Sequence, residues 1–246
     1  MSSEPSNGFA WVVGVGASVG LGAALARRFA RGGLTAVVTG RTQAQLDAVA
    51  REIEAAGGKA IAAAGDVTSE ADLRRILDSI ESAGPLEAAL FNAGNNAWKP
   101  TIEIDTAMFE GLWRVGCLGG FLFGRETARV MLPRGRGSLL FTGASASLRG
   151  RPQFTAFAAA KAGLRAVSQS MAREFGPQGI HVAHVVVDGV IDGDRVNSRV
   201  PGLKAQKGPD GMLNVDAIAD AFWSLHTQHR SAWSQEIDLR PYSESF

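Results

Sequence analysis

The chain is nearly devoid of two residue types that often carry chemistry. Its 246 residues include one cysteine, Cys117, and one tyrosine, Tyr242. A lone cysteine excludes an internal disulfide and is typical of proteins from a reducing compartment. No cluster of Cys, His and carboxylate residues has a spacing typical of a metal site, so we expect no bound metal.

Long apolar runs and an excess of either charge are also missing. No uninterrupted apolar run approaches the ~20 residues needed to cross a bilayer. The formal net charge is +1, which gives no reason to expect binding to nucleic acid or to an anionic membrane. Residues 1–8 are polar and lack the basic-then-apolar pattern of a signal peptide, so we expect a cytoplasmic protein.

What the chain does have is a cluster of glycines near its start. An apolar run from Ala10 to Val15 meets Gly14, Gly16, Gly20 and Gly22, and Leu21, Leu25 and Phe29 follow at helical spacing. This pattern predicts a buried strand that turns sharply into an amphipathic helix. Glycines let the backbone approach a ligand closely, and a helix start attracts phosphate. The stretch therefore predicts a nucleotide site, although such turns also serve as plain strand–helix connections.

Strand and helix patterns alternate along the rest of the chain. The strands are expected at 34–39, 59–64, 86–91, 137–142, 180–187 and 234–239, and the helices at 42–56, 69–83, 105–131, 153–175 and 215–226. Thr42 and Ser69 are expected to cap two of these helices. The alternation predicts one α/β domain over residues 1–246, a doubly wound Rossmann-type fold with about seven parallel strands. A polar tail (1–8) precedes it, and a Gly- and Pro-containing segment (188–214) is expected to act as a substrate lid.

With these residues in view, the chain resembles the short-chain dehydrogenases/reductases over nearly its whole length. Gly16, Gly20 and Gly22 match the family's glycine turn, and Asn92-Ala93-Gly94 matches its Asn-Ala-Gly motif. Lys161 falls where the family has its active-site lysine. The resemblance implies a nicotinamide cofactor held by Gly16, Ser18, Gly20, Leu21, Gly22, Asp66, Val67, Asn92, Ala93, Gly94, Lys161 and Gly189.

The end of the second strand bears on the choice of cofactor. Arg41 stands where a carboxylate would accept hydrogen bonds from a ribose 2′-hydroxyl and repel a 2′-phosphate. Because a guanidinium suits phosphate, we expect NADP(H) to be preferred, with NAD(H) possible. Thr42 can add a hydroxyl to the same phosphate. The alternative is that Arg41 is a solvated loop residue.

The active-site pattern departs from the family. The resemblance implies an Asn, Ser, Tyr and Lys set, but the tyrosine position holds Phe157, four residues before Lys161. The serine position falls on Ala144, with Ser145 adjacent, and the asparagine position on Gly116. Lys161 alone is retained, and Phe157 cannot donate the proton that carbonyl reduction needs.

These departures leave two classes of function open. The first is an oxidoreductase that moves hydride between NADP(H) and a small carbonyl, alcohol or activated C=C substrate, with the proton taken from water, Ser145 or another group. The second is a non-catalytic protein that binds the cofactor or a partner on the same fold. In either case the helices at 105–131 and 153–175 resemble those that pair between subunits of the family, so we expect a homotetramer or homodimer.

Overall fold

The computed structural model describes residues 8–244 and contains a seven-stranded, wholly parallel sheet in the order β3-β2-β1-β4-β5-β6-β9. The seven strands are β1 (Phe9–Val13), β2 (Thr35–Thr39), β3 (Lys59–Ala62), β4 (Leu86–Phe91), β5 (Ser138–Thr142), β6 (His181–Val187) and β9 (Glu236–Leu239). The order reverses between β1 and β4, so the strand ends part there and leave a crevice at their carboxyl ends, where ligands bind in folds of this kind.

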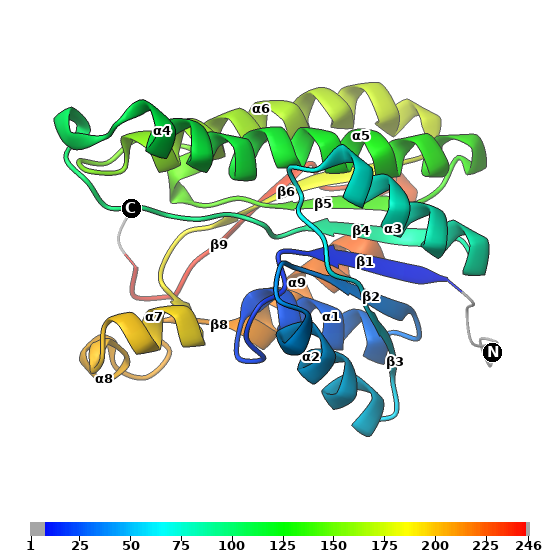
Figure 1. Ribbon diagram of the computed structural model, residues 1–246, viewed down its shortest axis with the longest axis horizontal. Helices are drawn as coiled ribbons and strands as arrows, with labels where there is room; N and C mark the ends of the chain where they lie inside the picture. The colour runs from blue at the N-terminus through cyan, green and yellow to red at the C-terminus, as the bar shows by residue number, and fades with distance from the viewer. Residues whose placement is uncertain (1–7, 245–246) are drawn as a thin grey trace.

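Helices cover both faces of the sheet (Figure 1). The main ones are α1 (Leu21–Arg31), α2 (Gln43–Ala55), α3 (Glu70–Ala83), α4 (Thr106–Trp113), α5 (Gly119–Met131), α6 (Thr155–Phe175) and α9 (Val215–His226). The layer of α1, α2 and α9 lies on one face, and the layer of α3, α4, α5 and α6 lies on the other. This is the doubly wound architecture that the alternating pattern predicts. Within residues 8–244, no helix combines the length and the apolar character needed to cross a membrane.

The core follows from the apolar strands. Every residue of β1, β5 and β6 is buried, as expected for central strands covered on both faces. Trp11, the largest residue of β1, is fully buried and satisfies its indole by donating to Thr39 Oγ1 at 2.9 Å. A polar ring nitrogen in the core thus finds the partner that burial demands.

Two local expectations need correction. Thr42 precedes α2 but its side chain makes no capping hydrogen bond, whereas Ser69 accepts from Asp72 N at 3.2 Å as predicted. The helix expected over 105–131 contains a π-helical turn at Arg114–Leu118 between α4 and α5. The other boundaries shift by a few residues at most, and residues 1–7 of the expected tail lie outside the described part.

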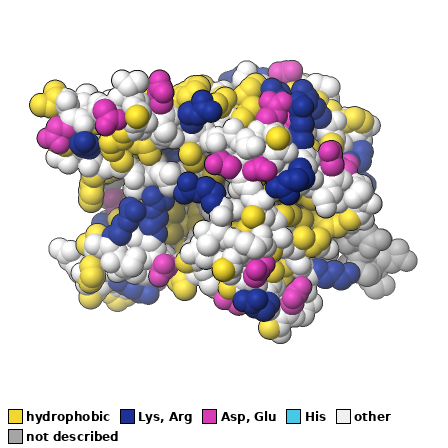
Figure 2. Space-filling model, in the orientation of Figure 1, with side chains coloured by type: hydrophobic (Ala, Val, Ile, Leu, Met, Phe, Trp, Pro, Cys, Tyr) yellow, Lys and Arg dark blue, Asp and Glu magenta, His cyan; other side chains and the backbone are white. Residues whose placement is uncertain are grey.

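The 188–214 segment is more ordered than an irregular loop. It holds β7 (Ile191–Asp192) and β8 (Leu213–Asn214), which pair in parallel, and two short helices, α7 (Asp194–Arg199) and α8 (Leu203–Lys207). Figure 1 places α7 and α8 beside the carboxyl ends of the strands, at the same end of the molecule as α4. The space-filling view in Figure 2 shows a hollow between these two parts of the molecule, with Lys and Arg side chains along it.

Candidate active site

The glycine turn after β1 packs directly against the segment after β4. Gly14 has φ +82°, and a Cβ there would lie 2.5 Å from Ala93 N, so a side chain at this position is excluded. Asn92 Nδ2 donates to Gly14 O at 3.2 Å. The structure therefore brings together two of the motifs that carried the resemblance, and Asn92 serves here to fix the turn.

The turn leads into a helix start that can receive a phosphate. Gly20 is the N-cap of α1 and offers no side chain to cap the first N–H groups of the helix. A Cβ on Gly16 would meet only Gln45 Oε1, at 3.9 Å, so this part of the turn faces open space. Uncapped N–H groups beside open space suit a dinucleotide pyrophosphate.

Other predicted cofactor residues lie around this turn. Leu21 and Gly22 begin α1, Asp66 and Val67 follow β3, and Gly189 follows β6. Ser18 donates its hydroxyl to Glu52 on α2 at 2.5 Å, so this side chain is already engaged by the protein. Asp66 Oδ1 accepts from both Thr68 N and Thr68 Oγ1 at 2.8 Å, which leaves its second oxygen for a ligand.

Arg41 and Thr42 are exposed just beyond the carboxyl end of β2. Among residues 8–244, the Arg41 guanidinium has no ion-pair partner. A cation with no carboxylate beside it is what a 2′-phosphate site requires.

Lys161 is the central charged group of the site. Its side chain is buried, and Nζ donates to Thr142 O at 2.7 Å. Burial lowers the pKa of Lys161 to about 8, because desolvation penalises the ammonium form. An ammonium group has three donors, so the single bond to Thr142 leaves Nζ able to bind ribose hydroxyls. A Cβ on Gly94 would lie 3.4 Å from Nζ, which shows how closely the Asn-Ala-Gly segment approaches the lysine.

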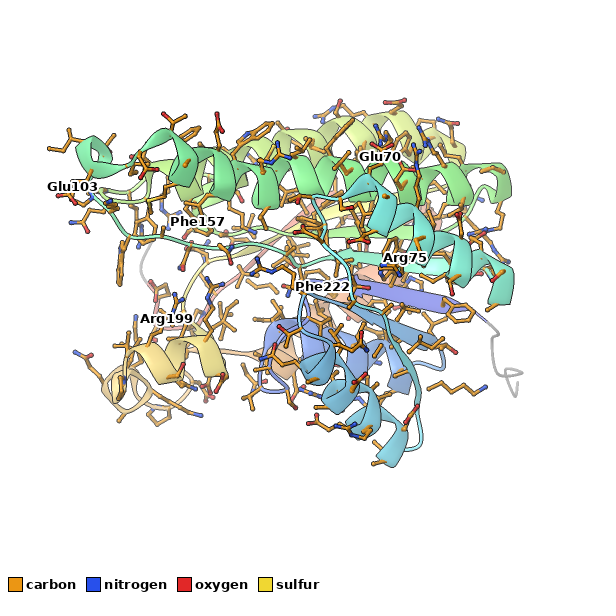
Figure 3. All side chains as sticks on the ribbon, viewed as in Figure 1. Glu70, Arg75, Glu103, Phe157, Arg199 and Phe222 are labelled. Atoms are coloured by element: carbon orange, nitrogen blue, oxygen red, sulfur yellow. The ribbon has the colours of Figure 1, made fainter. Side chains whose placement is uncertain are left out.

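The position of the missing acid is filled by an aromatic cluster. Phe157 lies one turn before Lys161 on α6, and its ring centroid is 6.2 Å from that of Phe154. Phe154 in turn lies 5.6 Å from Trp98, which is exposed beyond β4. Figure 3 shows Phe157 beside the opening between α6 and the 188–214 segment. This side of the site is apolar.

The position that the resemblance assigns to an asparagine lies in an irregular helical turn. Gly116 lies in the π-helical turn Arg114–Leu118, and a Cβ there would approach the Cβ of Ala160 to 3.1 Å. Single π turns are frequent at functional sites. Ser145 begins a 3₁₀ turn (Ser145–Ser147) after β5, and its hydroxyl has no hydrogen-bond partner within the described part of the chain.

A buried hydrogen-bond chain supports that 3₁₀ turn. Ser147 Oγ accepts from Ala144 N at 3.1 Å and lies 3.4 Å from His184 Nε2, while His184 Nδ1 lies 2.9 Å from Glu236 Oε2. Glu236 also accepts two bonds of 2.7 Å from Arg165 on α6, which with His184 lower the pKa of its carboxyl. Burial lowers the pKa of His184 to about 4, so the ring is neutral at pH 7. These residues come from distant parts of the chain, so local sequence patterns give no sign of the network.

A second ion cluster lies just after the ends of β6 and β9, around the buried carboxylate of Asp188. Asp188, 1% exposed, accepts from Arg149 Nη2 at 3.2 and 3.1 Å and also pairs with Arg240 at 3.6 Å. Asp188 N also donates to Leu239 O at 2.8 Å, which ties the residue after β6 to the end of β9. The charge of Arg149 is thus neutralised by the protein itself.

Comparison with known proteins decides the family. The family model for short chain dehydrogenase matches residues 10–202. The chain belongs to the short-chain dehydrogenase family. A gluconate 5-dehydrogenase from Gluconobacter oxydans (strain 621H) is 32% identical over 228 residues, which cover 91% of this chain and 82% of the relative.

Solved structures of short-chain dehydrogenases agree with the fold. One from Rhodopseudomonas palustris has a TM-score of 0.83 at 40% identity, covering 97% of this chain and 100% of that one. A metagenomic short-chain oxidoreductase, solved in complex with NADP, has a TM-score of 0.81 at 27% identity, covering 96% and 98%. The relatives carry dehydrogenase and reductase names, so the chain is an oxidoreductase of the short-chain dehydrogenase type.

Proposed function

We propose that this short-chain dehydrogenase uses NADP(H) to move hydride to or from a small carbonyl, alcohol or activated C=C substrate. The preference for NADP(H) over NAD(H) is supported by Arg41, exposed at the end of β2 with no ion-pair partner among residues 8–244. The complex of a 27% identical neighbour with NADP is consistent with it. The pyrophosphate would lie at Gly16, Gly20 and Gly22, and the nicotinamide ribose at Lys161.

The observation that carries the choice of substrate is Phe157 beside Lys161. When bound, the reduced cofactor supplies a hydride. Addition to a carbonyl carbon leaves an alkoxide that needs a proton at once, and Phe157 has none to give. Addition to the β-carbon of an enone or enoyl compound delocalises the electron pair onto a more distant oxygen. The aromatic wall of Phe157, Phe154 and Trp98 also suits an apolar substrate. Activated C=C reduction is therefore the favoured reaction.

Lys161 is the candidate source of the proton that completes the reduction. With a pKa of about 8, its ammonium form dominates at neutral pH yet releases a proton readily. Ser145 and water are the other candidates. The proton taken up by the substrate is replaced from solvent, so the net reaction consumes one hydride and one proton for each C=C bond.

The experiment measures NADPH and NADH binding by fluorescence and then follows cofactor oxidation with aldehydes, ketones, imines and activated enoyl compounds. We expect tighter NADPH binding, turnover chiefly with enoyl compounds, and a rate that falls as pH rises through about 8 because Lys161 loses its proton. Binding without turnover in any class would instead indicate a non-catalytic cofactor-binding protein. Absence of binding to either dinucleotide would overturn the proposal.

Three further assignments belong to the same proposal. We place the enzyme in the cytoplasm as a homodimer or homotetramer, and we assign the 188–214 segment as the substrate lid. The segment supports this role because α7 and α8 lie beside the carboxyl ends of the strands (Figure 1). The oligomer is supported by apolar side chains exposed on α4 and α5, namely Phe109, Trp113 and Phe121.

A further inference from the structure

Arg195, the second residue of α7, reaches across the hollow of the site. Its Nη1 donates to Gly94 O at 3.3 Å, linking the 188–214 segment to the Asn-Ala-Gly segment after β4. Gly94 is also the residue whose Cβ would lie 3.4 Å from Lys161 Nζ. The guanidinium and the buried ammonium therefore approach the same glycine.

The start of α7 is anchored beside the glycine turn. Asp194 N donates to Val19 O at 3.1 Å, and a Cβ on Gly193 would lie 3.0 Å from the same oxygen. Arg195 thus spans from the glycine turn at one end of the site to Gly94 near Lys161 at the other. A ligand that runs between these two points must pass the guanidinium.

Positive charge in this region is not balanced by the protein. Within residues 8–244, neither Arg195 nor Arg199, one turn later on α7, has a carboxylate partner. Of the two acids at the start of α7, Asp194 forms no ion pair within residues 8–244, and Asp192 is bound to Lys204 at 2.7 Å and to Asn197 at 2.9 Å. Partial burial and the charge of Arg199 both lower the pKa of Arg195, which means that they destabilise the charged form of its guanidinium. Figure 2 shows the resulting basic lining of the hollow, and Figure 3 shows Arg199 across it from Phe157.

We propose that Arg195, assisted by Arg199, forms an oxyanion-binding site on the 188–214 segment, which takes a phosphate or carboxylate oxygen of a ligand lying between the glycine turn and Lys161. On binding, the guanidinium exchanges its bond to the neutral Gly94 carbonyl for a charge-assisted bond. The anion comes from one of two sources, the pyrophosphate of the dinucleotide or a carboxylate on the substrate. The substrate source rests on the proposed function, whereas anion binding itself does not.

The test compares the wild type with Arg195→Gln, Arg195→Lys and the matched control Arg51→Gln, an exposed arginine on α2. Three dissociation constants are measured for each variant. That of inorganic pyrophosphate is measured by thermal shift in the absence of dinucleotide, and that of NADPH by fluorescence. That of benzoate is measured by thermal shift in the presence of saturating NADP⁺. Loss of a charge-assisted hydrogen bond is expected to weaken binding by about tenfold or more in Arg195→Gln. The loss should be smaller in Arg195→Lys, and Arg51→Gln should match the wild type.

The pattern of losses identifies the source. Weaker pyrophosphate and NADPH binding with unchanged benzoate binding assigns the site to the cofactor. Weaker benzoate binding alone assigns it to an acidic substrate. Arg195-dependent binding of pyrophosphate by a protein that binds neither dinucleotide would support the oxyanion site while refuting the proposed function. Three constants within twofold of wild type in Arg195→Gln, or no binding of any probe by the wild type, would overturn the inference.

Discussion

Two side chains on one face of α6 determine the chemistry of this site. Lys161 is buried, donates to Thr142 O and has a lowered pKa, whereas Phe157, one turn earlier, offers no hydroxyl. The motif match predicts that Lys161 stands at the family's lysine position and Phe157 at its tyrosine position. On the proposed function, Lys161 therefore contacts the cofactor while the side chain of Phe157 donates no proton.

Phe157→Tyr restores a hydroxyl beside the lysine. We expect carbonyl reduction to rise at least tenfold over wild type, because a positioned acid contributes about 10²–10⁴ in rate, while enoyl reduction changes little. The control is Phe121→Tyr, which adds a hydroxyl to an exposed ring on α5. If Phe157→Tyr alone gives no gain in carbonyl reduction but the double variant Phe157→Tyr/Ala144→Ser does, the missing serine also limits the reaction.

Arg41→Gln tests the choice of cofactor. Removing the guanidinium is expected to raise the dissociation constant of NADPH about tenfold and to leave that of NADH within twofold, because only NADPH has a 2′-phosphate. Fluorescence titration of both dinucleotides measures this, with Arg51→Gln as the control. Equal effects on the two dinucleotides would mean that Arg41 does not contact the 2′-phosphate.

At the scale of elements, the connection after β5 is held by a chain of bonds that runs through the sheet. Ser147, His184 and Glu236 link this connection to β6 and β9, and Arg165 ties Glu236 to α6. A Cβ on the neighbouring Gly143 would lie 2.3 Å from His184 Nε2, so the ring and the glycine fit together. The network positions the turn that carries Ser145.

His184 makes the stability of the fold depend on pH. Its pKa is lowered from 6.5 to about 4 by burial, so between these values the unfolded chain binds more protons than the folded one. The stabilisation is complete above pH 6.5 and is lost as pH falls toward 4, by about 3 kcal/mol from this residue. Burial lowers the pKa of His226 to about 4 as well, which adds a loss of the same sign.

His184→Ala is therefore expected to be less stable at pH 7 and to lose less stability than wild type between pH 7 and pH 4.5. Urea unfolding at several pH values measures both effects. Arg51→Gln, which changes an exposed side chain on α2, is the control and should match the wild type. An unchanged pH dependence in His184→Ala would show that the ring is not the group responsible.

The sequence predicted the elements better than their junctions. Apolar runs and helical spacing located the strands and helices, because each buries a face against the same sheet. The glycine turn, Asn92-Ala93-Gly94 and Lys161 could be matched by local motifs. The π-helical turn at Gly116 and the bonds of Arg195 and His184 could not, since they depend on residues far apart in the chain. Thr42 was expected to cap α2 from its residue type alone, but its side chain makes no capping bond.

At the scale of the whole molecule, the layer of α4, α5 and α6 carries an apolar outer surface. Phe109, Trp113 and Phe121 are each between 38% and 39% exposed, on helices that cover one face of the sheet. Burying such a surface between copies would remove apolar area from water.

Light scattering is expected to give a particle of two or four times the 25.8 kDa chain mass. Trp113→Glu should shift the population toward the monomer, because a buried carboxylate at the contact is unfavourable. Arg51→Glu, a charge change on α2 at the opposite face of the sheet, serves as the control. A wild-type particle with the mass of one chain would contradict the oligomer.

The ion clusters around the cleft have a consequence for how the protein is made. Glu236 and Arg240, which pair with His184, Arg165 and Asp188, come after all three in the chain. Translation therefore reaches Glu236 and Arg240 after the groups they pair with, and a nascent chain holds those groups without these partners until both residues have been made. A truncation before Glu236 would leave His184 and Arg165 without their carboxylate partner and Asp188 with Arg149 alone, and such a product would be a target for chaperones and proteases.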